Sequence, residues 1–400
     1  MRDAIFVAAR ASQTKMAKIA IDIRNIGKNR TGDEVVFFNL VKNLAVIDKE
    51  NEYVLLTDRN PVADADLRES IELLQLPNNF KVVPVCEGGA NKFSWNAWIL
   101  PKYLKENLVD ILQVQYITPF FIPKKIKAVT IIHDVSFKVF PKLIGKVDLF
   151  FLNFLIPLSL KRADKIVGVS QFTISEIKKF YQIPDEKLEW IHNAVADGFA
   201  ENILAEQLEM VRQKYNLPQK FILYIGTLQP RKNLPALIEA FIKIPTEKRK
   251  DLKLVLAGGR GHNFDTRIDE FIKNYGLRDE VFLPGFIDEA DKAAIFKLAH
   301  VFCFPSLYEG FGIPILEAMT LGVPTLASDI PPHLEITEDS VLLFDMTNAD
   351  DFSQKLTRIV SDDALRADLT QKELQQSAKF AWRQTAEKML EIYKGMKKMI

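Results

Sequence analysis

The sequence has few cysteines and almost no net charge. Only two of its 400 residues are cysteines, Cys86 and Cys303, so a disulfide framework is excluded. Both lie in apolar, strand-like runs, where we expect buried free thiols. Lys plus Arg number 53 and Asp plus Glu number 52, which gives a formal net charge of +1. No global field would therefore recruit nucleic acid, and any anion site must be local.

The chain also lacks long apolar segments. Residues 1–16 contain only the brief run AIFVAA, less than a signal peptide needs, and we interpret them as an N-terminal extension. The most apolar stretch, residues 147–160 (VDLFFLNFLIPLSL), is shorter than the roughly 20 residues of a membrane span. We interpret it as a buried helix on a sheet face, with a membrane-surface helix as the alternative. These interpretations predict a cytoplasmic, reducing location.

What the chain does have is a regular alternation of short β-rich runs and longer amphipathic segments, the pattern of parallel α/β sheets. Its length predicts two domains. The expected strands are residues 18–23, 53–57, 80–85, 111–115, 128–133, 165–170, 188–192, 221–226, 253–258, 281–283, 301–305, 324–328 and 341–344.

A domain boundary is predicted at the turn-like segment 193–199 (NAVADGF), which precedes a charged helical stretch and a fresh series of strands. We place the first domain at residues 17–196 and the second at 197–381. In doubly wound sheets, ligands bind beyond the carboxyl ends of the strands, so the residues that follow each strand are candidate site residues.

The segment 305–324 (PSLYEGFGIPILEAMTLGVP) carries the strongest chemical signal. Gly310 and Gly312 allow a ligand to approach the backbone, and a short helix is expected from about Pro314. Its N-terminus would attract an anion. Two carboxylates, Glu309 and Glu317, could address different hydroxyl groups of one ligand. The alternative is that both glutamates are solvated or that Glu317 only complements the helix dipole.

Two further strand ends carry candidate residues. Arg231 and Lys232 follow a strand that ends at Gly226, and a paired Arg and Lys can bind a diphosphate; a solvated basic turn is the alternative. His133 and Asp134 follow another strand. A structural histidine is the alternative there.

The segment 305–324 closely resembles the Glu-x7-Glu signature of glycosyltransferase family 4, retaining enzymes of the GT-B fold. Beyond the two glutamates, the resemblance includes the glycine pair, EAM at 317–319, GVP at 322–324 and PGF at 284–286. It implies two Rossmann-like doubly wound domains that face each other across a cleft. It also implies that the terminal helix, residues 382–400, crosses back to the first domain. Because that segment is amphipathic and basic at its end, contact of its basic end with anionic lipid is a further expectation.

The resemblance implies roles for individual residues. Glu309 would lie near the donor sugar, Glu317 would bind the ribose, and Lys232 would bind the diphosphate. Many members carry Arg where Thr227 stands, so we expect Arg231 to supply part of that charge. The expected catalytic residues are Glu309, His133, Lys232 and Arg231. The expected donor-binding residues are Gly32, Gly226, Arg231, Lys232, Gly285, Phe286, Gly310, Phe311, Gly312, Ile313 and Glu317.

Other motifs are discounted. LAGGRG at 256–261 lacks the spacing of a dinucleotide fingerprint and is interpreted as a tight turn. Asp64 and Asp66 are interpreted as helix capping and first-turn charge rather than a metal motif. No zinc spacing, P-loop or GxSxG is present.

We therefore expect a metal-independent, retaining hexosyltransferase without cofactor, with mannose as one candidate sugar. The donor would be a GDP- or UDP-sugar and the acceptor a hydroxyl of a glycan or lipid-linked sugar; no nucleic acid partner is expected. Peripheral contact with the inner face of the membrane is a further expectation. The alternatives are an epimerase or phosphorylase of the same fold, or a non-enzymatic sugar-binding protein.

Overall fold

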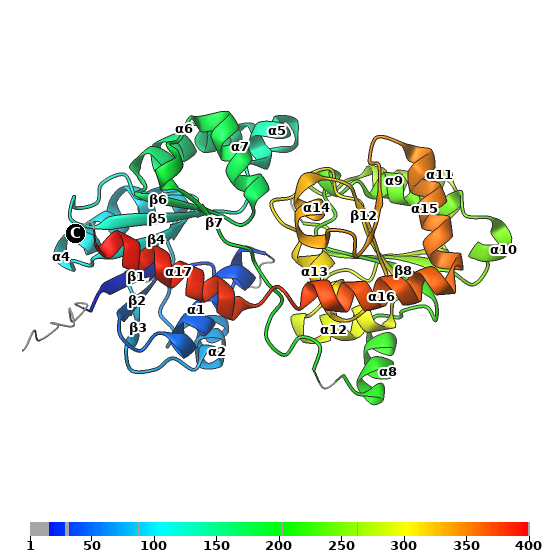
Figure 1. The fold of residues 1–400 in the computed structure, drawn as a ribbon, viewed down its shortest axis with the longest axis horizontal. Coiled ribbons are helices and arrows are strands. Elements are labelled where there is room, and N and C mark those ends of the chain that lie inside the picture. The colour runs from blue at the N-terminus through cyan, green and yellow to red at the C-terminus, as the bar shows by residue number, and fades with distance from the viewer. Residues whose placement is uncertain (1–15, 29–31, 87, 202, 262, 399–400) are drawn as a thin grey trace, which may run out of the picture.

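The computed structural model contains two parallel sheets, each the centre of one domain (Figure 1). The structure describes residues 16–28, 32–86, 88–201, 203–261 and 263–398, so the extension predicted at residues 1–16 lies almost entirely outside the described residues. The first sheet has the order β3-β2-β1-β4-β5-β6-β7. Its strands are β1 (Lys18–Asp22), β2 (Glu52–Thr57), β3 (Phe80–Pro84), β4 (Ile111–Gln115), β5 (Lys127–Ile132), β6 (Lys165–Gly168) and β7 (Leu188–Trp190).

The second sheet repeats this arrangement in the order β10-β9-β8-β11-β12-β13. Its central strand β8 is buried at every position, as expected for a strand with helices on both faces. The strands are β8 (Phe221–Ile225), β9 (Lys253–Ala257), β10 (Val281–Phe282), β11 (Val301–Phe304), β12 (Thr325–Ser328) and β13 (Leu342–Phe344). The predicted fold class of two doubly wound α/β domains is confirmed.

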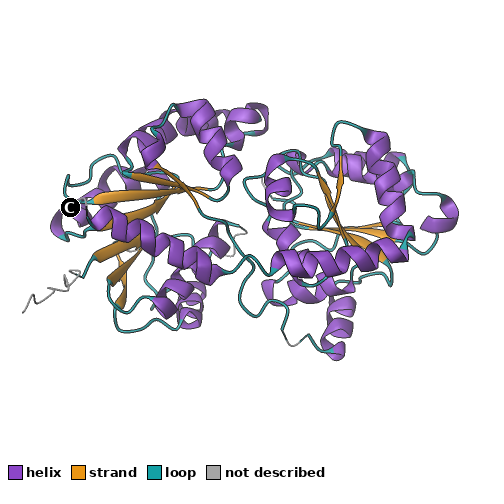
Figure 2. Cartoon of the chain, in the orientation of Figure 1, coloured by secondary structure: helices purple, strands orange, loops and turns teal. Residues whose placement is uncertain are grey.

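Helices cover both faces of each sheet (Figure 2). The first domain contains α1 (Asp33–Ile47), α2 (Ala65–Leu74), α3 (Lys92–Ser94), the π-helix η1 (Trp95–Ile99), α4 (Leu100–Glu106), α5 (Ser136–Val139), η2 (Pro141–Leu143), α6 (Lys146–Arg162), α7 (Gln171–Tyr181) and η3 (Asp185–Lys187). The second contains α8 (Ala205–Lys214), the 3-10 helix η4 (Pro230–Lys232), α9 (Leu234–Ile242), α10 (Thr246–Arg249), α11 (Arg267–Asn274), α12 (Glu289–Leu298), α13 (Ile313–Thr320), α14 (Pro331–Thr337), α15 (Ala349–Ser361) and α16 (Asp363–Ser377). Asp64 caps α2 as expected, because its side chain accepts from the backbone N–H of Leu67.

The C-terminal helix α17 (Trp382–Lys397) leaves the second domain and packs against α1 of the first (Figure 1). Its Tyr393 hydroxyl is buried and donates to the side-chain oxygen of Gln113 in β4. Thr385 donates to the carbonyl of His192 at 2.8 Å. The two domains are thus joined by a second chain crossing in addition to the segment after β7.

Two burial expectations are wrong. Cys303 is buried, but Cys86 is only partly buried because β3 ends at Pro84 and the chain has already left the sheet. Helix α6 contains the segment expected to be a buried helix on a sheet face, with a membrane-surface helix as the alternative, yet one of its faces is exposed. Leu155, Ile156 and Leu160 are buried, whereas Phe150 and Phe154 are 68% and 58% exposed.

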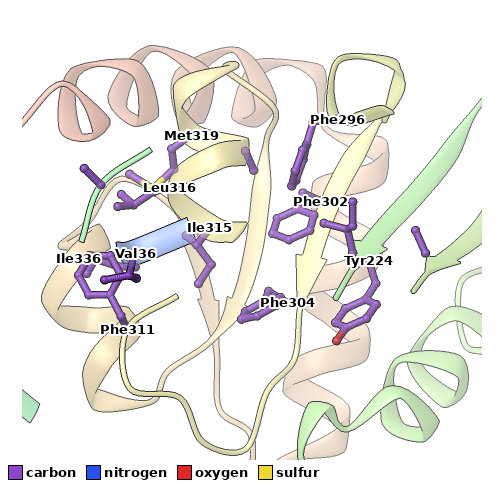
Figure 3. Packing of buried hydrophobic residues seen from close by; sticks show 14 of the residues in the cluster. Val36, Tyr224, Phe296, Phe302, Phe304, Phe311, Ile315, Leu316, Met319 and Ile336 are labelled. Carbon is purple, nitrogen blue, oxygen red and sulfur yellow. The ribbon is translucent and has the colours of Figure 1, made fainter. Parts of the chain in front are cut away.

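A hydrophobic cluster spans the sheets and reaches from one domain to the other (Figure 3). Val36 of α1 belongs to the same cluster as Phe311 and Ile336 of the second domain. Among the described residues, no helix is both long enough and apolar enough to cross a membrane.

Candidate active site

A cavity of about 620 Å³ lies between the two domains. Its walls come from residues that follow strands of both sheets, including Tyr116 after β4 and Gly226 after β8. In each sheet the strand order reverses beside the first strand of the domain, at β1/β4 and at β8/β11. Ligand crevices form at such reversal points in doubly wound sheets, so the topology alone places a ligand site here.

A cluster of three charges lies at the wall of this cavity, with Lys232 and Glu309 buried and Arg231 partly buried. The Lys232 ammonium lies 2.5 Å from Oε1 of Glu309, and the Arg231 guanidinium lies 2.9 Å from Oε2. Burial alone would raise the pKa of Glu309, but the charges of Arg231 and Lys232 outweigh it and lower that pKa to about 2. Burial lowers the pKa of Lys232 to about 8, although Glu309 opposes the shift. The cluster therefore carries a net charge of +1 when Lys232 is protonated.

Short-range bonds hold these cations in place. Arg231 and Lys232 belong to η4, which ends at Asn233 in the left-handed conformation with φ of 56°. Arg231 also donates to the carbonyl of Tyr308 at 2.7 Å, and its own carbonyl accepts from the Leu307 N–H at 2.9 Å. The Lys232 ammonium lies 5.0 Å from the centroid of the Phe304 ring, a cation–π contact. The basic turn is thus a buried cationic site rather than a solvated surface turn.

The glycine pair is required by close packing and by backbone conformation. A Cβ on Gly310 would lie 1.7 Å from the carbonyl oxygen of His133 in the other domain, so no larger residue fits. Gly312 has φ of 125°, a value that other residues rarely adopt, and it precedes α13. This turn places the start of α13 at the cavity edge, where Gly312, Ile313 and Pro314 are lining residues. Pro314 has no N–H, and the Ile315 N–H donates to the Gly312 carbonyl at 3.0 Å, so the N–H groups of Gly312 and Ile313 remain for a ligand.

Glu317 lies behind the cavity wall, whereas Glu309 forms part of that wall. It is buried and does not line the cavity, but its partner Lys292 of α12 does. The Lys292 ammonium lies 2.5 Å from Oε1 of Glu317, while Oε2 has no hydrogen-bond partner among the described residues. Burial by itself would lower the pKa of Lys292, and the charge of Glu317 reverses this and raises it. Glu317 retains one free acceptor atom, a property suited to a ligand hydroxyl group.

His133 lines the opposite wall, at the end of β5. Its Nε2 lies 2.6 Å from the side-chain nitrogen of Gln115 and 4.0 Å from Oδ1 of Asp33. The side-chain oxygen of Gln115 accepts from Asn25, so the Gln115 amide donates to His133 Nε2. In this arrangement the imidazole proton resides on Nδ1.

Hydrogen bonds between the domains close the cavity on one side. Ser170 and Thr173, at the start of α7, donate to the Gly310 carbonyl at 2.6 and 3.2 Å. The Glu335 carboxylate accepts from the backbone N–H groups of Gln171 and Phe172 at 2.8 and 3.0 Å. It also lies 2.6 Å from Nε2 of His192. Glu335 of α14 thus caps a helix of the other domain.

The cavity brings together most of the residues singled out from the sequence. Those that line it are Gly32, His133, Gly226, Arg231, Lys232, Phe286, Glu309, Gly310, Phe311, Gly312 and Ile313. Gly285 and Glu317 are not among its lining residues. Near Gly32, the Glu34 carboxylate accepts from the Gly27 N–H at 2.6 Å.

Sequence reasoning missed Lys292, Gln115, Tyr116 and Asp33, all close to the predicted residues. Gln115 ends β4 and Tyr116 follows it, so the strand-end rule could have found both. Lys292 lies inside an ordinary amphipathic helix and carries no motif. The glycines of LAGGRG also line the cavity, at Gly258, Gly259 and Gly261, so this turn does more than connect two elements. No group of three or more His, Cys, Asp or Glu in the described part of the chain could hold a metal ion.

Both domains match known protein families. Residues 31–198 match the family model described as Glycosyltransferase Family 4, and residues 207–376 match Glycosyl transferases group 1. O-antigen chain mannosyltransferase B of Escherichia coli is 31% identical over 277 residues, which cover 69% of this chain and 72% of that protein. Serotype-specific mannosyltransferase WbdA of Escherichia coli is 34% identical over 244 residues, or 60% of this chain. The chain spans only 30% of the length of WbdA.

Solved structures share the fold over nearly the whole chain. HepE of Anabaena, in complex with UDP and glucose, superposes with a TM-score of 0.71 at 16% identity, covering 95% of this chain and all of that one. Sucrose-phosphate synthase of Thermosynechococcus elongatus superposes with a TM-score of 0.73 at 18% identity, covering 95% and 99%. At these identities the likeness shows the fold alone.

Proposed function

Because the chain belongs to glycosyltransferase family 4 and has the GT-B fold, we propose that it transfers a hexose from a nucleotide diphosphate-sugar to an acceptor hydroxyl. The observation that carries the proposal is the buried cluster of Arg231, Lys232 and Glu309 beside the N-terminus of α13. Two fixed cations and a helix N-terminus at one cavity wall suit a diphosphate, and the donor sugar would extend toward His133.

The leaving diphosphate gains negative charge as the glycosidic bond breaks. Arg231 can bind two phosphate oxygens with its planar guanidinium, Lys232 acts as a compact charge, and the N–H groups of Gly312 and Ile313 at the start of α13 add donors. These groups are held in place before the reaction by burial and by their bonds to Glu309 and Tyr308. Such fixed donors stabilise developing charge. We therefore propose that the transfer requires no metal ion.

On the sugar side, we propose that Glu309 orients the donor or stabilises the positive charge that develops at the anomeric carbon, with retention of configuration. His133, held by Gln115, would bind the donor sugar from the first domain. Glu317 would accept hydrogen bonds from the ribose through Oε2, the atom without a partner among the described residues. This last role requires Lys292 to shift, since Lys292 lines the cavity and Glu317 does not.

The similar proteins guide the choice of substrates. Because two of the relatives are mannosyltransferases, one of them named an O-antigen chain mannosyltransferase, we propose mannose as the sugar and a glycan or lipid-linked glycan as the acceptor. A GDP- or UDP-sugar remains the proposed donor. The free thiols of Cys86 and Cys303 accord with the proposed cytoplasmic location, which cell fractionation would test.

The two motif glutamates provide the sharpest test of the donor site. Glu317→Ala should weaken nucleoside diphosphate binding by roughly 10- to 150-fold, because a charged hydrogen bond contributes about 1.5 to 3 kcal/mol. Glu309→Gln should lower kcat while that binding stays nearly constant. Calorimetric titration with GDP and UDP measures binding without the sugar. Equal loss of binding in both variants, or none in Glu317→Ala, would contradict these roles.

Product analysis tests the reaction itself. Incubation with GDP-mannose or UDP-glucose and a glycan acceptor should release free nucleoside diphosphate together with a new glycoside. With inorganic phosphate added to the mixture, transfer of the sugar to phosphate and release of a sugar phosphate would identify a phosphorylase instead. Conversion of the nucleotide-sugar without acceptor would identify an epimerase.

A further inference from the structure

Helix α6 exposes a patch of large apolar side chains on the outside of the first domain. Phe121, Phe150 and Phe154 are 74%, 68% and 58% exposed. Exposed apolar side chains are common as single residues, but a contiguous group of them marks an interaction surface. The group comes from three segments far apart in the sequence: residues 93–98, 118–121 and 147–158.

These side chains surround a groove of about 870 Å³, separate from the proposed donor cavity. Phe93 lies 5.2 Å from Trp98 and 6.2 Å from Phe120 between ring centroids, so the aromatic side chains form one connected surface. The residues that line the groove are Phe93, Thr118, Pro119, Phe120, Phe121, Phe150, Phe151, Phe154, Leu155, Leu158, Lys161, Arg162, Asp164 and Lys187. We call this surface the α6 groove.

The charged side chains that line the α6 groove are mostly basic, Lys161, Arg162 and Lys187 against Asp164, although the chain as a whole is nearly neutral. Segments 118–125 and 142–162 contain a single acidic residue, Asp148, and six basic ones: Lys124, Lys125, Lys142, Lys146, Lys161 and Arg162. Asp164, which also lines the groove, is paired with Lys127 at 3.2 Å. None of the five lysines in these segments forms an ion pair within the described part of the chain. Apolar and aromatic side chains beside unneutralised lysines match the boundary of an anionic lipid bilayer.

A second copy of the chain fits this surface poorly. A symmetric dimer would place the same patch against itself. The lining residues Lys161, Arg162 and Lys187 would then meet their copies, and the lining carboxylate Asp164 is already paired with Lys127. We therefore propose that the α6 groove docks on an anionic membrane surface. The aromatic side chains enter the headgroup and acyl boundary, and the lysines contact lipid phosphates.

The position of the groove connects membrane docking to the proposed donor cavity. Tyr116 lines the donor cavity, and Pro119, three residues later, lines the α6 groove. Three extended residues span at most about 11 Å. Ser159 of α6 fixes this short connection, because its hydroxyl donates to the Tyr116 carbonyl at 2.8 Å and accepts from the Thr118 N–H at 2.7 Å. A docked membrane would thus lie beside the first-domain wall of the cavity.

Vesicle flotation of the full chain tests the proposal without any sugar substrate, so its result is independent of the proposed reaction. We expect binding to vesicles of phosphatidylglycerol and phosphatidylcholine at a 3:7 ratio, and much weaker binding to pure phosphatidylcholine. Phe150→Gln with Phe154→Gln should lower the affinity for the anionic vesicles roughly tenfold or more. Lys124→Gln and Lys125→Gln should each lower it roughly fivefold at low salt.

A matched control removes two equally exposed apolar side chains far from the groove, Leu204 and Met210, which are 66% and 63% exposed. The control Leu204→Gln with Met210→Gln should bind vesicles like the unmodified chain. Absence of vesicle binding, equal binding to neutral and anionic vesicles, or equal loss in the control would overturn the proposal. So would a dimer in sedimentation that the two phenylalanine substitutions convert to a monomer, because the groove would then be an interface between copies.

Discussion

Lys232 should make nucleotide binding depend on pH in a range where most lysines remain charged. Burial lowers the pKa of Lys232 to about 8, while the Glu309 carboxylate opposes the shift. A bound diphosphate would bring further negative charge to the cavity wall that Lys232 lines and would raise the pKa again. Binding is therefore coupled to protonation of this ammonium group.

The sign and size of the effect follow from that coupling. Below pH 8, Lys232 is already protonated and the dissociation constant for a nucleoside diphosphate should be flat. Above pH 8, each further pH unit lowers the fraction of molecules with a protonated Lys232 roughly tenfold. The affinity for the nucleoside diphosphate should therefore fall roughly tenfold per pH unit. The decline ends where pH reaches the pKa of Lys232 in the complex.

Calorimetric titrations from pH 6.5 to 9.5 measure this, with Lys232→Arg as the matched variant because a guanidinium stays charged over the whole range. When the nucleotide binds at pH 8, the unmodified chain should take up about half a proton per molecule more than the Lys232→Arg variant. Ionisation of the nucleotide itself is common to both proteins and cancels. Parallel pH profiles for two folded proteins would refute the reasoning.

Contact between the domains and use of a metal lead to three further expectations. Gly310→Ala should lower kcat roughly 100-fold, because its Cβ would lie 1.7 Å from the His133 carbonyl oxygen and displace the cavity walls; unchanged kcat would contradict it. Glu335→Ala removes the carboxylate that caps α7 and pairs with His192, so the radius of gyration by small-angle scattering should increase, and an unchanged radius would count against this role. Turnover should be unaffected by EDTA; a loss restored by magnesium or manganese would disprove metal independence.

Almost all of the fold could be predicted from the sequence, because parallel strands that are buried on both faces appear as short apolar runs. Every strand of the described chain was located, with errors of one or two residues, such as β6 ending at Gly168 rather than at residue 170. These errors arise where a strand's apolar run continues into a loop that is also buried. Ser170, for example, is fully buried yet lies outside β6, where its hydroxyl donates to the Gly310 carbonyl.

The site was harder to predict, since its ion pairs join residues that no local pattern connects. Glu309 is 77 residues from Lys232 in the sequence, and Glu317 is 25 residues from Lys292. The strand-end rule identifies cavity-facing residues but not which charges pair. The sequence left two interpretations of α6 open for a different reason: an apolar run indicates which side chains avoid water, and not whether protein or another surface covers them.

The ion pairs also change how the two glutamates should respond to substitution. Glu309 competes with a diphosphate for Arg231 and Lys232, so its neutralisation frees both cations and favours nucleotide binding. The same change also removes the negative charge of Glu309, which raises the pKa of Lys232 against the effect of burial. The pKa of Lys232 therefore falls, fewer molecules carry the ammonium at a given pH, and nucleotide binding is disfavoured. These opposing effects are the physical reason for expecting nearly constant affinity in Glu309→Gln near neutral pH. Above pH 8 the second effect should prevail, and Glu309→Gln should then bind the nucleotide more weakly than the unmodified chain.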